Sequence, residues 1–158
     1  MSSNKTNAAR LLDARGIAYD LLPYDLPSEH FNAVAVAIQI DLPASQVFKT
    51  LVTTGSTGGP CFAVIPADRE LDVKALAAVR SERSMRLLPL REVEGHTGYV
   101  RGAVTVIGAK RAYPAVVDGS ALDFDVIAVS AGARGLQMSL ATQDYLDVTS
   151  AIVAGITR

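Results

Sequence analysis

The chain has 158 residues, of which 49% are hydrophobic and 20% charged, with a net charge of −1. This length fits one domain, residues 1–158, with a hydrophobic core large enough to be stable without disulfides or bound metals. One cysteine and two histidines exclude a disulfide framework and argue against a structural zinc site. Because the sequence holds neither a membrane-length apolar run nor a signal-peptide pattern, we expect a cytoplasmic protein with no membrane segment. No motif in the sequence calls for a cofactor.

The charge is unevenly distributed along the chain. Residues 1–68 and 116–158 carry a net charge of −2 and −3, whereas residues 69–115 carry nine basic and five acidic side chains, a net charge of +4. A basic segment of this kind can contact phosphate groups, although a solvated Arg-rich surface would give the same pattern. A near-neutral total charge therefore does not argue against a nucleic-acid partner.

The first half of the chain alternates helix and strand signals. The 3–4 spacing of apolar residues predicts a helix over 4–15, which Gly16 ends. A strand is expected over 17–24, a short helix over 33–40 with Asn32 as its cap, and a turn or helix start over 41–45. The β-branched run 47–53 and the run 61–67 predict a hairpin around the glycine-rich turn 55–60.

The second half has more strand signals than helix signals. Asp72 is expected to cap a helix over 72–80, followed by a strand over 85–89 and a helical turn over 90–94. Further strands are expected over 100–109, 115–118, 126–130 and 136–140. Thr142 is expected to cap a last helix that reaches Val153. Short strand–turn–strand spacing without a βαβ rhythm predicts an α+β fold, with a mixed, largely antiparallel sheet flanked by helices.

Lys49 is the first candidate for chemistry, since no other basic residue occurs between Arg15 and Arg69. In a strand it would share a face with Val47 and Leu51, so an ammonium group would lie among apolar side chains. At an edge its amine would simply reach water. In a pocket it could bind an anion, stabilise an oxyanion or act as a base with a lowered pKa.

Two glycine clusters, residues 98–108 and 130–135, form the second candidate feature. Each contains an arginine, and glycines let backbone N–H groups approach a ligand closely. Neither cluster has a GxGxxG or P-loop pattern, so both could also be ordinary turns. The aromatic residues Tyr24 and Phe31 could stack on a nucleobase or fill the core.

Several separate motifs occur along the chain in a fixed order: Val47-Phe48-Lys49-Thr50-Leu51, Ala63-Val64-Ile65-Pro66, Thr97-Gly98-Tyr99-Val100-Arg101-Gly102, Ile107-Gly108 and Val129-Ser130-Ala131-Gly132. Together they resemble the YbaK family, bacterial Cys-tRNA(Pro) deacylases related to the editing domain of prolyl-tRNA synthetase. The resemblance covers nearly the whole chain.

The resemblance implies a β-sheet curled toward a barrel and a free-standing, metal-free deacylase that acts in trans on mischarged tRNA, with prolyl-tRNA synthetase as a possible partner. It places the functional lysine on Lys49 and the oxyanion-side loop on Gly102 to Gly108. The implied substrate-binding positions are Tyr24, Phe31, Thr50, Thr105, Ile107, Ser130 and Gly132. Substrate-assisted chemistry, through a ribose hydroxyl or a cysteinyl thiol, would explain the lack of a catalytic triad.

The chain departs from the family pattern at the wall of the implied pocket. Many relatives have the sequence Gly-Gly-x-Ser-Pro-x-Gly at the positions of residues 102–108, whereas this chain lacks the second glycine, the serine and the proline. Close relatives also often carry an acidic residue at the position of Gln137. These changes concern amino-acid specificity more than the fold. The alternatives are a non-catalytic tRNA-binding module of the same fold and an enzyme that forms a Schiff base at Lys49.

Overall fold

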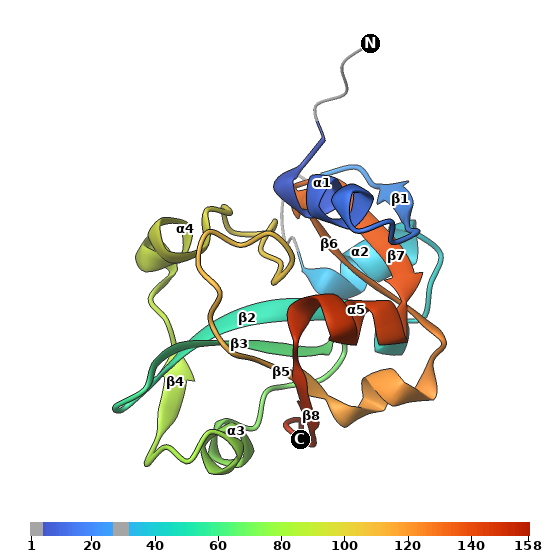
Figure 1. Ribbon diagram of the computed structural model, residues 1–158. Coiled ribbons are helices and arrows are strands. Elements are labelled where there is room, and N and C mark those ends of the chain that lie inside the picture. The colour runs from blue at the N-terminus through green and yellow to red at the C-terminus, as the bar shows by residue number, and fades with distance from the viewer. Residues whose placement is uncertain (1–4, 27–31) are drawn as a thin grey trace.

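The computed structural model describes residues 5–26 and 32–158 and shows two β-sheets with helices around them (Figure 1). The helices are α1 (Asn7–Ala14), α2 (Ala33–Gln39), α3 (Val73–Val79), α4 (Leu90–Thr97) and α5 (Thr142–Thr149). The strands are β1 (Asp20–Pro23), β2 (Phe48–Gly55), β3 (Gly59–Pro66), β4 (Met85–Leu87), β5 (Ala115–Asp118), β6 (Val126–Ala133), β7 (Leu136–Ala141) and β8 (Ile152–Ala154). No helix in these two described ranges is long and apolar enough to cross a membrane.

The larger sheet has the order β4-β2-β3-β5-β8, and the smaller one has the order β1-β7-β6. Pairing is antiparallel within β4-β2-β3 and within the smaller sheet, and parallel from β3 to β5 and from β5 to β8. The sheets approach each other where Val47 bridges Ala128, but they do not close into a barrel. The predicted α+β class with a mixed, largely antiparallel sheet is therefore confirmed.

The main core lies between the two sheets. Alternate side chains of each strand point to the same face, and those of β2, β3, β6 and β7 meet there. Phe48 and Val64 pack in one cluster with Ile127 and Met138, and each of these residues is at most 1% exposed. Helices α1 and α5 close this cluster, which fixes β2 against β6.

Local capping signals correctly predict the starts of two helices. The side chains of Asn32 and Asp72 accept hydrogen bonds from backbone N–H groups at the starts of α2 and α3. The helix predicted over 4–15 begins later, after Thr6, whose side chain accepts a hydrogen bond from the Ala9 N–H. The hairpin β2–β3 also forms as predicted, with Gly55 opposite Gly59. These signals depend only on neighbouring residues, which explains why the sequence is sufficient to find them.

The strand predicted over 100–109 is wrong, because this segment forms an irregular loop between α4 and β5. Gly102 and Gly108 have φ angles of 88° and 70°, which a strand does not accommodate. The N–H of Ala103 donates instead to the carbonyl of Val100 and closes a turn. The buried Ala103 and Ile107 reproduce the apolar spacing of a strand, which misled the prediction.

The predicted end of the chain is also wrong. Helix α5 ends at Thr149, Ser150 takes a left-handed conformation with φ 53°, and Ile152–Ala154 forms β8 against β5. Thr142 is the first helical residue, not the cap, and its hydroxyl donates to the Phe124 carbonyl. Pairing with β5 satisfies backbone groups of this segment, so tertiary contacts override its helical spacing.

Candidate functional site

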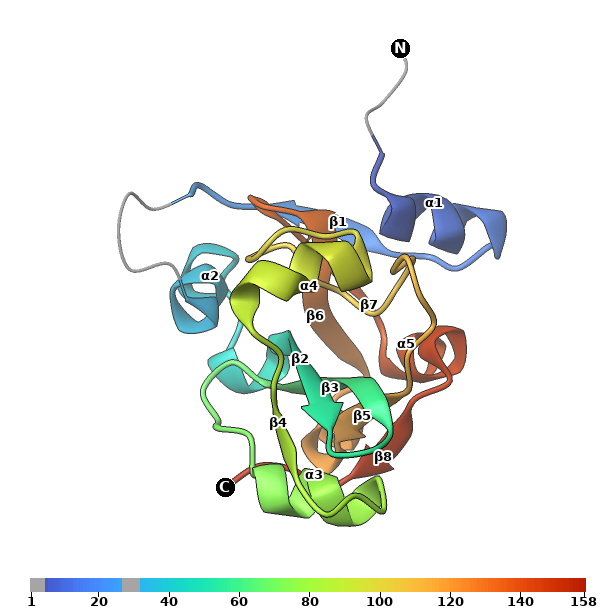
Figure 2. The same ribbon diagram turned by 90° about the vertical axis from the view of Figure 1, so that its left-hand side faces the viewer.

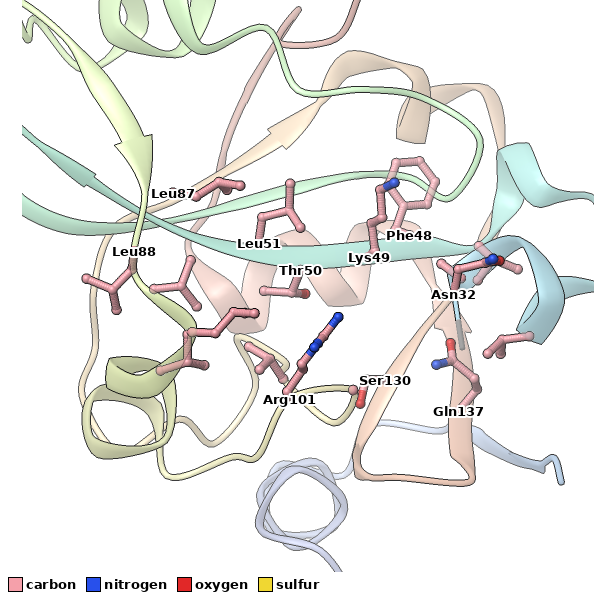
Figure 3. Close-up of a pocket in the computed structure, with 18 of the residues that line it drawn as sticks. Asn32, Phe48, Lys49, Thr50, Leu51, Leu87, Leu88, Arg101, Ser130 and Gln137 are labelled. Carbon is pink, nitrogen blue, oxygen red and sulfur yellow. The ribbon is translucent and has the colours of Figure 1, made fainter. Parts of the chain in front are cut away.

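A cavity of about 660 Å³ lies between β2, α2, the segment from β4 into α4, the loop after α4, and the paired strands β6 and β7 (Figure 3). Four of the predicted site residues line it: Lys49 and Thr50 on β2, Gly102 on the loop and Ser130 on β6. They come from positions up to 81 residues apart in the sequence. The fold thus brings part of the predicted set into one cavity.

Lys49 is half-buried at the cavity, and its ammonium group donates a hydrogen bond to the Ala67 carbonyl at 3.2 Å. Burial lowers the pKa of Lys49 below its usual value, and the carboxylates of Glu70 and Asp68 partly oppose this shift. Burial acts in this direction because a charged amine loses hydration in a less polar environment. The lysine is therefore a cation whose proton is less tightly held than that of an exposed lysine.

The cavity wall opposite β2 includes the turn at Gly102. The positive φ of Gly102 is what the third residue of a type II turn requires, and only glycine adopts it without strain. The neighbouring Arg101 extends from this turn toward β2 (Figure 3). Loop residues 101 and 102 thus present both a backbone turn and a second cation to the cavity.

Ser130 fixes this loop to β6. Its hydroxyl donates to the Ala103 carbonyl at 2.8 Å and accepts a hydrogen bond from the Gly132 N–H at 3.1 Å. Both functions of the hydroxyl are therefore used within the protein. Ser130 lines the cavity, but its visible role is to hold the loop that carries Gly102.

Three other predicted residues of the loop do not line the cavity. Gly108 packs against the start of α1, where a Cβ atom would lie 3.0 Å from the carbonyl carbon of Asn7. Ile107 is buried in the main core, and its carbonyl accepts a hydrogen bond from the Tyr99 hydroxyl at 2.8 Å. Thr105 is fully buried. Gly108, Ile107 and Thr105 therefore anchor the loop in the protein interior, on the side away from the cavity.

Two further predicted residues also lie away from the cavity lining, and a third is outside the described residues. Gly132, with φ 94°, faces the ring of Tyr99, whose Cε1 would lie 2.9 Å from a Cβ at this position. Tyr24 is buried where β1 ends, and its N–H donates to the Gly135 carbonyl. The prediction for Phe31 falls in residues 27–31, outside the described ranges.

The structure adds Arg101, Gln137 and Asn32 to the cavity lining. Arg101 belongs to the basic segment 69–115 and to the glycine cluster 98–108 but is not among the predicted site residues, and Gln137 is noted there only as a departure from a family pattern. The described lining contains the two cations Lys49 and Arg101 and no carboxylate, so it is suited to an anionic group or to an oxygen that becomes negatively charged. Residues 5–26 and 32–158 contain no cluster of three His, Cys, Asp or Glu side chains that could hold a metal ion.

Comparison with known proteins gives one consistent result. A model of the aminoacyl-tRNA editing domain matches residues 28–148. A protein of Enterococcus faecalis (strain ATCC 700802 / V583), named as a candidate Cys-tRNA(Pro)/Cys-tRNA(Cys) deacylase, EbsC, is 36% identical over 156 residues, which is 99% of this chain and 95% of the relative.

Solved structures share the fold. The hypothetical protein APE2540 superposes with a TM-score of 0.87 at 24% identity and covers 97% of this chain and 100% of its own. A candidate trans-editing enzyme for prolyl-tRNA synthetase superposes with a TM-score of 0.85 at 22% identity, over 99% of both chains. With the family match over most of its length and a relative at 36% identity, this chain belongs to the aminoacyl-tRNA editing domain family.

Proposed function

We propose that this protein is a free-standing aminoacyl-tRNA deacylase that acts in trans, with Cys-tRNA(Pro) as its expected substrate. The observation that carries the proposal is the convergence of Lys49, Gly102 and Ser130 on one cavity in a chain of the editing domain family. The relative that is 36% identical over 95% of its length is named for activity on Cys-tRNA(Pro) and Cys-tRNA(Cys). The working unit would be the single domain 1–158, in the cytoplasm where tRNA is charged.

The reaction needs little covalent help from the protein, because an aminoacyl ester is already activated. A nucleophile attacks the carbonyl carbon of the ester, and the carbonyl oxygen becomes an oxyanion. The bond between this carbon and the ribose oxygen then breaks as the ribose oxygen takes up a proton. The nucleophile is a water positioned by the neighbouring ribose hydroxyl, or the cysteinyl thiol, which would leave as a thiolactone. The protein contributes position and charge stabilisation.

The cavity residues have separate roles in this proposal. The turn at Gly102 borders the ester carbonyl, and Lys49 holds the terminal ribose or phosphate and orients the ester. Arg101 adds a second positive charge at the same cavity, where a phosphate group would be bound. Thr50 lines the same cavity next to Lys49 on β2 and would contact the substrate from there.

A deacylation assay over a panel of mischarged tRNAs tests this proposal. We expect accelerated loss of cysteine from Cys-tRNA(Pro) relative to the spontaneous rate. A protein that binds these tRNAs but leaves every ester intact would instead be a non-catalytic module. Trapping of a carbonyl ligand on Lys49 by borohydride would indicate Schiff-base chemistry. Repeating the assay with prolyl-tRNA synthetase present tests whether this enzyme is a partner.

Lys49→Ala should lower kcat/KM by about 100-fold, because the variant loses the cation that orients the ester, and a misplacement of about 1 Å at the reacting group costs about that much. The fold should persist, because the amine makes one hydrogen bond and is only half-buried. Lys5→Ala is the matched control, since Lys5 is an exposed lysine ahead of α1, outside both the cavity lining and the basic segment 69–115. Unchanged turnover by a folded Lys49→Ala variant would contradict the proposed role.

A further inference from the structure

Gln137 is a buried polar residue whose side chain no part of the fold requires. It lies on β7 directly opposite Ser130 of β6 and Leu22 of β1, and it is 7% exposed. Its Oε1 atom is buried, with no hydrogen-bond partner among the described residues. Burying an amide oxygen without a partner costs free energy, so an apolar residue would serve the fold better at this position.

The amide group faces the cavity. Gln137 belongs to the cavity lining, and Figure 3 shows its amide on the same side of the cavity as Ser130 and Asn32, away from Leu87 and Leu88. Rotation about the last side-chain bond exchanges its oxygen and nitrogen, so either end can be presented to a ligand. The neighbouring Ser130 has both hydroxyl functions engaged, which leaves Gln137 as the polar group of this wall with an unused acceptor.

The exposure of the lining residues indicates which part of a tRNA would reach Gln137. Ser130 and Gln137 are 8% and 7% exposed, whereas Leu87 and Leu90 are 56% and 62% exposed at the rim formed by β4 and α4. The aminoacyl group is the tip of the tRNA, so it enters first, and the ribose and phosphate groups follow behind it. The buried wall therefore meets the aminoacyl group.

Every aminoacyl ester carries an α-amino group, which is a hydrogen-bond donor and loses water when it enters the cavity. The described lining offers it no carboxylate, and a desolvated donor needs an acceptor. Building on the proposed deacylase function, we propose that Gln137 is a substrate-binding residue whose amide oxygen accepts a hydrogen bond from the α-amino group of the aminoacyl ester. It would select aminoacyl groups over acyl groups that lack this amine.

A pair of substrates isolates this contact. The first is cysteinyl-tRNA(Pro), and the second is 3-mercaptopropionyl-tRNA(Pro), which has hydrogen in place of the α-amino group and keeps the thiol. After division by the ratio of the two spontaneous deacylation rates, because the α-amino group also activates the ester itself, we expect the wild-type protein to prefer the cysteinyl ester by about 10- to 100-fold in kcat/KM, the effect of one hydrogen bond to a charged or strongly polar donor. Gln137→Met, which keeps the side-chain length, should abolish this preference.

Two further measurements separate binding from folding. The Tm of Gln137→Met should be unchanged or raised, because the variant removes a buried atom without a partner. Gln137→Glu, which keeps an acceptor oxygen, should retain the preference. Met138→Leu is the control, since Met138 follows Gln137 on β7 but packs in the main core and does not line the cavity.

The outcomes are distinct. If the wild-type protein deacylates Cys-tRNA(Pro) but shows no preference for the amine, or if Gln137→Met keeps that preference, the inference about Gln137 is wrong and the proposed function stands. Loss of the preference in Gln137→Glu as well as in Gln137→Met would also overturn the role of the acceptor. If the wild-type protein deacylates no aminoacyl-tRNA, the proposed function itself fails.

Discussion

At the scale of single residues, the surroundings of Lys49 have two opposing effects on its pKa. Partial burial favours the neutral amine, whereas Glu70 and Asp68 favour the ammonium form. Glu70 is itself largely exposed and pairs with Arg158 at 3.4 Å. The acidic residues lie outside the cavity lining, so they tune the proton affinity of Lys49 without contacting a ligand in the cavity.

This arrangement predicts a pH dependence. If Lys49 acts as a cation, activity should fall as pH rises through its lowered pKa, because the amine then loses its proton. Glu70→Gln removes a charge that raises this pKa, so the decline should begin at a lower pH than in the wild type. The measurement is kcat/KM against pH after subtraction of spontaneous ester hydrolysis.

Lys49→Arg is the control for this experiment. Arginine stays protonated throughout the accessible range, so any activity retained by this variant should show no such decline. A decline that stays in place or moves to higher pH in Glu70→Gln would contradict the assignment of the alkaline limb to Lys49.

At the scale of elements, the loop between α4 and β5 carries part of the site but has no regular structure of its own. Three contacts hold it: the Ser130 hydroxyl on the Ala103 carbonyl, the Tyr99 hydroxyl on the Ile107 carbonyl, and the Lys110 N–H on the Thr97 carbonyl. The first of these is the nearest to Gly102. The position of the cavity wall therefore depends on β6 as much as on the loop sequence.

Ser130→Ala should destabilise the protein by about 1 to 2 kcal/mol, because the buried Ala103 carbonyl loses its donor. It should also lower kcat more than it raises KM, since the turn at Gly102 is displaced from the ester carbonyl. Thermal unfolding and steady-state kinetics measure the two effects.

Two further variants serve as controls for Ser130→Ala. Ser130→Thr, which keeps a hydroxyl, should recover part of the stability and part of the activity, and Ser139→Ala on β7, outside the cavity lining, should change neither. An unaltered Tm in Ser130→Ala would show that this hydrogen bond does not stabilise the loop.

At the scale of the whole molecule, the basic middle of the sequence becomes one side of the structure. Figure 2 shows α3, β4 and α4 in succession along one face, with the cavity bordered by β4 and α4. Exposed basic side chains on these elements, on the turn between α3 and β4 and on the loop after α4 are Lys74, Arg83, Arg86, Arg91, Arg101, Lys110 and Arg111. A net charge of −1 for the whole chain conceals this segregation.

This distribution predicts steep salt dependence of tRNA deacylation. The plot of log(kcat/KM) against log[salt] has a negative slope, and each phosphate contact that is lost makes this slope less negative by about 0.7 to 0.9. The double variant Arg83→Ala/Arg86→Ala should therefore flatten the slope by about 1 to 2, and Arg15→Ala, at the end of α1, should leave it unchanged. Equal slopes for the double variant and the wild type would exclude this face as the tRNA-binding surface.

The extent of correct prediction follows the range of the interactions. The helix starts at Asn32 and Asp72 and the β2–β3 hairpin depend on residues a few positions apart, and the sequence was sufficient to predict them. The strand predicted over 100–109 and the helix predicted beyond Thr149 failed, because their backbone conformations are decided by distant partners. Apolar spacing alone cannot distinguish a buried loop from a strand.

By itself the sequence determined the α+β class, the order of most elements and the candidacy of Lys49, since these follow from local propensity, patterning and a set of motifs. Only the tertiary structure decided which candidates share a cavity: Lys49, Thr50, Gly102 and Ser130 do, whereas Gly108, Thr105 and Ile107 support the loop from behind. It also revealed Gln137, whose buried oxygen without a partner is visible only once β6 and β7 are paired. A cavity is formed by side chains from strands and loops far apart in the chain, and no local signal encodes which of them will meet.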